Sequence, residues 1–167
     1  MEIGLSLGAN MGDRLEQLIQ AKNMILALPG IKLSAQSPIY ETEPVDVPAE
    51  FSHLPFLNGI LIIETLISTR QMMNMFHFIE QKVGRIPSPV VNAPRPVDID
   101  IIYADQLRID EDHIVIPHPR WSIRRFVLQP LSDVRHELHI PGQSGTVAEV
   151  LAELQDPAKV TLFTKTW

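Results

Sequence analysis

Hydrophobic and polar residues alternate along several short segments of the chain, which is typical of β-strands. The segment 56–65 contains a continuous Ile and Leu run, which predicts a strand buried on both faces. The expected strands are 2–8, 31–42, 56–65, a strand from Val97 that carries two aspartates, a hairpin through 104–116, and a closing strand over 160–164.

Hydrophobic residues recur at helical spacing between these strands. One helix is predicted from about Asp13 to Pro29-Gly30, and a second from a cap at Ser68 or Thr69 to Gly84. A third is predicted over 146–154, where Thr146 and Glu149 have capping-box spacing. Two proline-containing segments, 43–55 and 85–96, fit neither pattern and are predicted to be long loops, which in small domains are often functional.

The order strand, helix, strand, strand, helix, strand predicts an α+β fold. We expect a ferredoxin-like βαββαβ core with extra strands and helices, in which the helices pack on a mostly antiparallel sheet. The length of 167 residues suits a single domain over 1–167.

Composition excludes several classes of function. The chain has no cysteine, so disulfides, thiol catalysis and zinc sites that need sulfur are excluded. Its net charge of −6 argues against a general nucleic-acid binder, although arginines cluster between 85 and 135, which suits a small anionic ligand. No apolar run is long enough to span a bilayer and the N-terminus lacks a basic signal region, so we expect a cytoplasmic protein without a membrane partner.

Asp98 and Asp100 share one face of their predicted strand, because successive side chains point to opposite faces. Their carboxylates are expected roughly 7 Å apart. Water on a solvent-facing sheet, protonation, an arginine or a metal ion could relieve their repulsion. Arg95, between two prolines at the start of the strand, favours a site in which carboxylates, Mg²⁺ and guanidinium groups handle phosphates.

The stretch IPHPRWSIRRF holds His118 between prolines, with Arg124 close behind. A histidine of this kind is either structural or a phosphate contact, and the nearby arginine makes a phosphate contact reasonable. The chain has no P-loop and no G-x-G-x-x-G motif, so nucleotide binding by either device is excluded.

Seven stretches between about residues 3 and 135 form an ordered set: GLSLGANMGDR, YETEP, FLNGILIIET, IEQKVGR, APRPVDIDIIY, IPHPR and RRFVLQPL. Together they resemble the 6-hydroxymethyl-7,8-dihydropterin pyrophosphokinases of folate biosynthesis. The resemblance implies a ferredoxin-like fold with two mobile catalytic loops. It also implies transfer of the β,γ-diphosphoryl group of ATP to the hydroxymethyl group of a reduced pterin, giving AMP.

The resemblance also assigns roles to individual residues. Asp98 and Asp100 match the aspartates that hold two Mg²⁺ ions, and with Arg85 and Arg95 they form the implied catalytic set. The implied ATP-binding residues are Glu80, Arg85, Arg95, Ile101, His118 and Arg124. The implied pterin-binding residues are Thr42, Pro44, Val45, Phe56, Asn58 and Phe126. The expected partners are ATP and a reduced pterin, and we expect a monomer.

The second loop departs from the family pattern G-R-x-R-x-x-R-W-G-P-R. Pro87 and Val91 stand where arginines are expected, and Asn92 replaces the tryptophan. In the first loop, Asp46 stands where glycine is frequent. Three alternatives to an active 6-hydroxymethyl-7,8-dihydropterin pyrophosphokinase therefore stay open. They are a weak or inactive pterin- or nucleotide-binding relative, an enzyme of the same chemistry that acts on another pterin-like acceptor, and an RNA-binding module, which the acidic charge disfavours.

Overall fold

A computed structural model describes residues 1–45, 47–86, 88–90, 93–111 and 113–167. The elements in chain order are β1 (Glu2–Ala9), α1 (Arg14–Leu26), β2 (Ile31–Gln36), β3 (Ile39–Thr42), η1 (Ala49–Phe51), β4 (Phe56–Thr65), α2 (Thr69–Val83), β5 (Asp98–Ala104), β6 (Ile109–Glu111), β7 (Ile114–Ile116), η2 (Trp121–Ile123), α3 (Arg125–Arg135), α4 (Val147–Glu153) and β8 (Val160–Thr164). Among these residues no helix is both long and apolar enough to cross a membrane.

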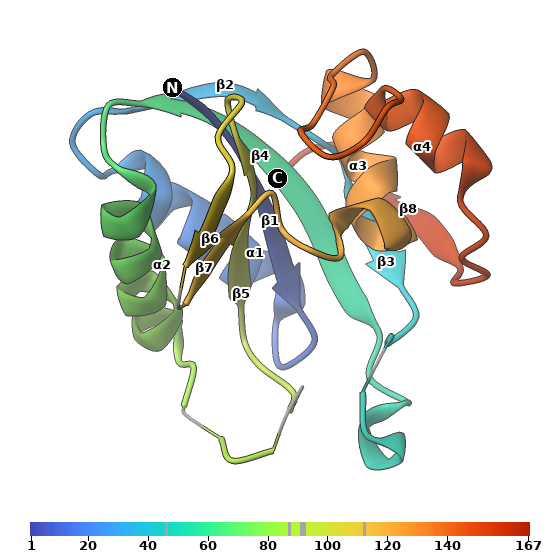
Figure 1. Cartoon of the computed structure of the whole chain (residues 1–167). Helices are drawn as coiled ribbons and strands as arrows, with labels where there is room; N and C mark the ends of the chain where they lie inside the picture. The colour runs from blue at the N-terminus through green and yellow to red at the C-terminus, as the bar shows by residue number, and fades with distance from the viewer. Residues whose placement is uncertain (46, 87, 91–92, 112) are drawn as a thin grey trace.

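The central sheet has the strand order β5-β1-β4-β3-β8, and β2 also pairs with β4. All of these pairings are antiparallel. Helices α1 and α2 cover one face of the sheet, and α3 and α4 cover part of the other (Figure 1). The predicted α+β class, with a ferredoxin-like core and helices on a mostly antiparallel sheet, is confirmed.

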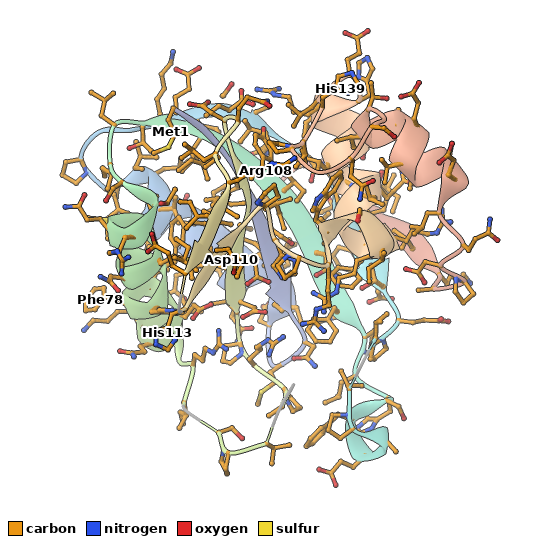
Figure 2. All side chains as sticks on the ribbon, viewed as in Figure 1. Met1, Phe78, Arg108, Asp110, His113 and His139 are labelled. Carbon is orange, nitrogen blue, oxygen red and sulfur yellow. The ribbon has the colours of Figure 1, made fainter. Side chains whose placement is uncertain are left out.

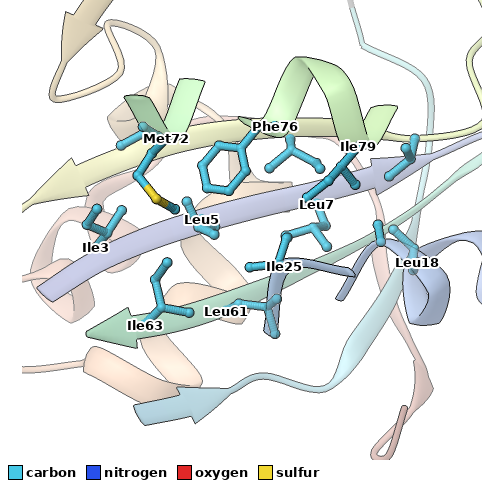
Figure 3. Close-up of a cluster of buried hydrophobic side chains, with 14 of the residues drawn as sticks. Ile3, Leu5, Leu7, Leu18, Ile25, Leu61, Ile63, Met72, Phe76 and Ile79 are labelled. Carbon is cyan, nitrogen blue, oxygen red and sulfur yellow. The ribbon is translucent and has the colours of Figure 1, made fainter. Parts of the chain in front are cut away.

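Strand β1 separates two hydrophobic clusters by simple alternation. Ile3, Leu5 and Leu7 point toward α1 and α2, where they meet Phe76 and other apolar side chains (Figure 3). The second cluster, on the opposite face, joins β4 and β5 to α3 and α4. Gly4, Ser6 and Gly8 of β1 face this second side, and their small size allows other groups to lie close to the strand.

A β-bulge divides β5 into two parts. Gly4 pairs with Tyr103, but the next residue of β1, Leu5, pairs with Ile101, so Ile102 is extra. Because of the extra residue, Ile102 and Tyr103 both belong to the second cluster. The part of β5 that carries the two aspartates keeps regular alternation beyond the bulge.

Three segments differ from the sequence interpretation or extend it. The single strand predicted over 31–42 is two strands, because the chain breaks at Ser37-Pro38, where proline lacks the N–H of a ladder bond. The predicted hairpin exists, but β6 and β7 form their own two-stranded sheet. Helix α3 was not predicted: it has Pro130 inside it and no side-chain hydrogen bond at its N-cap.

We expect Gly4→Ala to destabilise the protein. A Cβ at this position would lie 2.2 Å from Cε1 of Tyr103, whose hydroxyl donates a hydrogen bond of 2.6 Å to Glu2. The crowding should cost about 1–3 kcal/mol of unfolding free energy, measured by urea denaturation. In a Tyr103→Leu background the same change should cost less, and equal costs in both backgrounds would show that the ring is not the cause.

Candidate active site

The two long loops leave the central sheet at the same end (Figure 1). A cavity opens at this end, on the second face of the sheet. Helix α3 packs on the same face, and the cavity lies beside its first turn, where Phe126 is a lining residue. Its lining residues come from five separate parts of the chain: Ser6, Gly8, Thr42, Glu43, Val45, Val47, Phe56, Asn58, Arg95, Asp98, Asp100, Arg124 and Phe126. The cavity thus contains both aspartates and most of the residues assigned to the pterin.

The floor of the cavity is set by strand register. Gly8 pairs with Asp98 on one side and with Asn58 on the other, and Ser6 pairs with Asp100. The small residues of β1 therefore lie between the aspartates and Asn58. A Cβ on Gly8 would lie 2.8 Å from Oδ1 of Asn58, so a larger residue here would crowd the Asn58 amide. Ser6 and Gly8 were not singled out from the sequence, although their alternation with leucine was visible there.

The two aspartates have different electrostatic surroundings. Asp98 is paired with two guanidinium groups: Arg85 Nη1 lies 2.8 Å from its Oδ1, and Arg95 Nη2 lies 3.0 Å from its Oδ2. Burial and, to a smaller extent, the charge of Asp98 raise the pKa of Asp100 to about 7, although Arg95 and Arg124 oppose the rise. Asp100 is therefore the carboxylate whose charge is less well compensated by the protein.

Glu80 holds the end of α2 against β5. Its side chain is buried, and Oε1 accepts a hydrogen bond of 2.8 Å from the backbone N–H of Ile99, between the two aspartates. The same oxygen lies 2.7 Å from Nη1 of Arg85, which also contacts Asp98. Glu80 thus orients Arg85 and fixes the strand that carries the carboxylates.

Arg95 is held by its backbone, and part of its side chain is available for a ligand. Its N–H donates to Oδ1 of Asn10 at 2.9 Å, and its carbonyl accepts from the Asn10 N–H at 3.3 Å. The buried Nε of Arg95 has no hydrogen-bond partner among the described residues. A buried donor without a partner is costly, and because Arg95 lines the cavity, an anion bound there would meet a guanidinium that the protein has not fully satisfied.

The residues present fit a magnesium ion that is shared with a substrate. The described residues contain no group of three or more His, Asp or Glu side chains that could hold a metal ion. Two carboxylates on one strand face are nevertheless sufficient for Mg²⁺, which keeps several waters and completes its shell with substrate phosphates. A cation at Asp98 and Asp100 would also offset the charge that raises the pKa of Asp100.

The far side of the cavity combines polar and aromatic groups. Asn58 Nδ2 donates a hydrogen bond of 2.6 Å to Oγ1 of Thr42, and both side chains are buried. This bond fixes the orientation of the Asn58 amide, which lines the cavity. Phe56 and Phe126 also line it, and the guanidinium of Arg124 lies 5.3 Å from the Phe126 ring centre. The arrangement suits a flat heterocycle with polar edges.

Several assigned residues lie outside the cavity lining. Ile101 is buried in the first hydrophobic cluster, on the opposite face of the sheet from Asp100. Pro44 is not a lining residue, although its neighbours Glu43 and Val45 are. Glu80 and Arg85 reach the site through ion pairs, as described above. His118 lies beside β5, where its backbone N–H donates a hydrogen bond of 2.9 Å to the backbone carbonyl of Ile102.

His118 should be neutral in the protein without bound nucleotide. Burial, together with the charges of Arg124 and Arg120, lowers its pKa to about 4. Nδ1 accepts from the Arg120 N–H at 3.1 Å, so the neutral ring carries its proton on Nε2 and can donate it to a phosphate oxygen. We expect the His118 ring resonance to move only below about pH 5 in an NMR titration. Protonation between pH 6 and 7 would contradict this assignment.

The departures in the loops lie outside the described residues: Asp46, Pro87, Val91 and Asn92. Arg125 and Arg108 are two further arginines of the cluster between 85 and 135, and neither takes the place of the absent loop arginines. Arg125 is bound to Asp156 and to the carbonyl of Leu154. Arg108 lies at the end of the β6–β7 hairpin away from the loops, and His113 lies at the other end (Figure 2).

Comparison with known proteins gives the family. Residues 4–136 match the model of the 7,8-dihydro-6-hydroxymethylpterin-pyrophosphokinase (HPPK) family. A protein of Methylorubrum extorquens named 2-amino-4-hydroxy-6-hydroxymethyldihydropteridine pyrophosphokinase is 33% identical over 157 residues, covering 93% of this chain and 94% of that protein. The folic acid synthesis protein fol1 of Schizosaccharomyces pombe is 35% identical over 150 residues, 90% of this chain, which spans only 20% of that longer protein.

A solved structure has the same fold. The crystal structure of Plasmodium falciparum HPPK-DHPS wild type with pteroate has a TM-score of 0.68 at 13% sequence identity, covering 90% of this chain and 44% of that one. At this identity the likeness concerns the fold alone. The family model and the bacterial relative, taken with the paired aspartates at the cavity, show that this chain belongs to the 7,8-dihydro-6-hydroxymethylpterin-pyrophosphokinase family.

Proposed function

We propose that this protein transfers the β,γ-diphosphoryl group of ATP to the hydroxymethyl oxygen of 6-hydroxymethyl-7,8-dihydropterin. The bond between the α-phosphate and β-phosphate of ATP breaks, a bond from the acceptor oxygen to the β-phosphorus forms, and the hydroxyl proton is lost as AMP leaves. The observation that carries this proposal is that Asp98 and Asp100 line the same cavity as Asn58, Phe56 and Phe126.

The aspartate side of the cavity would hold the nucleotide phosphates. Asp98 and Asp100 would share two Mg²⁺ ions with ATP, and the ions would neutralise charge on the phosphates. Arg85 and Arg95, positioned by Glu80 and by Asn10, would direct their remaining N–H groups at phosphate oxygens. Arg124 and the Nε2 proton of His118 would supply further donors to the same anion.

The opposite side would hold the pterin. Its bicyclic ring would stack between Phe56 and Phe126, and its polar edge would hydrogen-bond with Asn58 and Thr42. Gly8 pairs with Asn58 on one side and with Asp98 on the other, so only one strand lies between the two residues. The hydroxymethyl group of a ring bound at Asn58 would therefore be within reach of Asp98 and Asp100. This geometry favours an acceptor that is a small flat heterocycle.

The proposal is tested by product analysis. The purified protein is incubated with Mg²⁺, ATP and 6-hydroxymethyl-7,8-dihydropterin, and the nucleotides are separated. The expected result is AMP that accumulates only when the pterin is present. ADP in place of AMP would indicate a single phosphoryl transfer and would contradict the proposal.

The altered second loop favours one alternative, a pterin-binding relative with little or no activity, because Pro87 and Val91 remove two arginines that would stabilise the transferring phosphates. Calorimetry separates this alternative from the proposal. Binding of the pterin together with Mg²⁺ and an ATP analogue, without AMP formation from ATP, would support the inactive relative.

A further inference from the structure

A guanidinium group ties together the two ends of the first loop. Arg14 is the first residue of α1, and its Nη2 lies 2.7 Å from Oε2 of Glu41 in β3. Its Nη1 donates a hydrogen bond of 3.0 Å to the carbonyl oxygen of Pro55, which directly precedes β4. One side chain therefore bridges both strands at the point where the loop 43–55 leaves the sheet and returns to it.

The bridge lies directly behind two residues of the proposed pterin site. Thr42 pairs with Phe56 across β3 and β4, and both side chains line the cavity. Glu41 precedes Thr42 and Pro55 precedes Phe56, so the two groups that Arg14 contacts are the sequence neighbours of these residues. Successive strand residues point to opposite faces, which places the Glu41 side chain on the α1 face of the sheet.

Stability of α1 does not account for an arginine at this position. A cation in the first turn of a helix is opposed by the helix dipole. The helix is already capped by Asp13, which accepts a hydrogen bond of 3.1 Å from the Glu16 N–H. The contacts of Arg14 lead instead to the loop, and its side chain is only 24% exposed.

We propose that Arg14 is a positioning residue for the pterin acceptor. By joining Glu41 to the Pro55 carbonyl it holds the base of the loop in place, so that Thr42 and Phe56 are arranged before the acceptor binds. This inference rests on the proposed function, because it assigns the cavity beside Thr42 to the pterin. Among the described residues, the Arg14 side chain makes its polar contacts with Glu41 and Pro55 and with none of the residues assigned to ATP, so its effect should be confined to the acceptor.

The test compares Arg14→Ala with Glu41→Gln and with the exchanged pair R14E/E41R. Arg70→Ala is the matched control, because Arg70 also pairs with a glutamate, Glu111, but far from the first loop. The dissociation constant of 6-hydroxymethyl-7,8-dihydropterin is measured by calorimetry with Mg²⁺ and α,β-methylene-ATP, which cannot be cleaved between its α- and β-phosphorus atoms. The KM values for pterin and ATP are measured by AMP formation.

We expect Arg14→Ala and Glu41→Gln to weaken pterin binding about threefold to tenfold, as is reasonable for a partly exposed ion pair with an added backbone contact. The exchanged pair should recover part of the loss, and the KM for ATP and the control variant should stay at wild-type values. Unchanged pterin affinity in Arg14→Ala would overturn the inference. So would an equal loss for pterin and ATP with a lowered melting temperature, which would indicate general destabilisation.

The same measurements separate this inference from the proposed function. If the wild-type protein binds the pterin but forms no AMP, the proposed function fails, and the dissociation constants still decide whether Arg14 positions the acceptor. If the wild-type protein forms AMP and Arg14→Ala binds the pterin normally, only the positioning role fails.

Discussion

Asp100→Asn is expected to lower AMP formation by about 1,000-fold or more, and Asp98→Asn by a similar factor. Each substitution keeps the shape of the side chain but removes one of the two charges that would hold Mg²⁺. The stability of the two variants should differ. Asp98 is paired with Arg85 and Arg95, whereas the charge of Asp100 is opposed by burial and by Asp98. Asp100→Asn should therefore raise the melting temperature of the metal-free protein while it abolishes turnover.

The control for this prediction is Asp110→Asn, on the exposed β6 strand, which should keep wild-type activity. Isothermal titration with Mg²⁺ and an ATP analogue would show whether the lost activity follows lost metal binding. Near-wild-type turnover by either aspartate variant would show that the metal assignment is wrong.

Arg95→Ala is expected to lower kcat about 100-fold to 1,000-fold, the range found when one preorganised donor is removed from a developing charge. Arg95 contacts Asp98, its backbone is fixed by Asn10, and its buried Nε lacks a partner among the described residues. Arg95→Lys keeps the charge but loses the planar fork, so it should recover only part of the rate.

Single-turnover measurement of AMP formation separates chemistry from product release in these variants. Arg108→Ala, which removes an arginine at the opposite end of the β6–β7 hairpin from the loops, is the control and should leave kcat unchanged (Figure 2). Wild-type kcat in Arg95→Ala would exclude a direct role for this arginine in the reaction.

Local patterns in the sequence were sufficient to predict most of the central elements. The alternation in β1 and the caps at Ser68 and Thr146 act within a few residues, and the structure contains these elements with the expected caps. Helix α3 could not be predicted in this way. It contains Pro130 and lacks a side-chain cap, so its formation depends on packing Val127, Leu128 and Leu131 against the sheet.

The same distinction applies to the site. Asp98 and Asp100 could be placed on the same face of the sheet from the sequence, because side chains two residues apart in a strand point to the same side. The roles of Asn10, Arg14 and Glu80 depend on contacts between residues far apart in the sequence, such as Asn10 with Arg95. A spacing pattern contains no information about such contacts, which arise only when β1, α1 and α2 meet β5 and the loop ends.

The bulge in β5 has a consequence for how this protein can change. The extra residue Ile102 shifts side-chain alternation by one position, so the residues before and after it alternate between the two faces of the sheet in different phase. Loss of that one residue would reverse the facing of one part of β5 relative to the other. Either Tyr103 would turn away from the second cluster, or Asp98 and Asp100 would turn away from the cavity and into the first cluster. A deletion or insertion within this strand is therefore expected to be more damaging than a substitution that keeps its length.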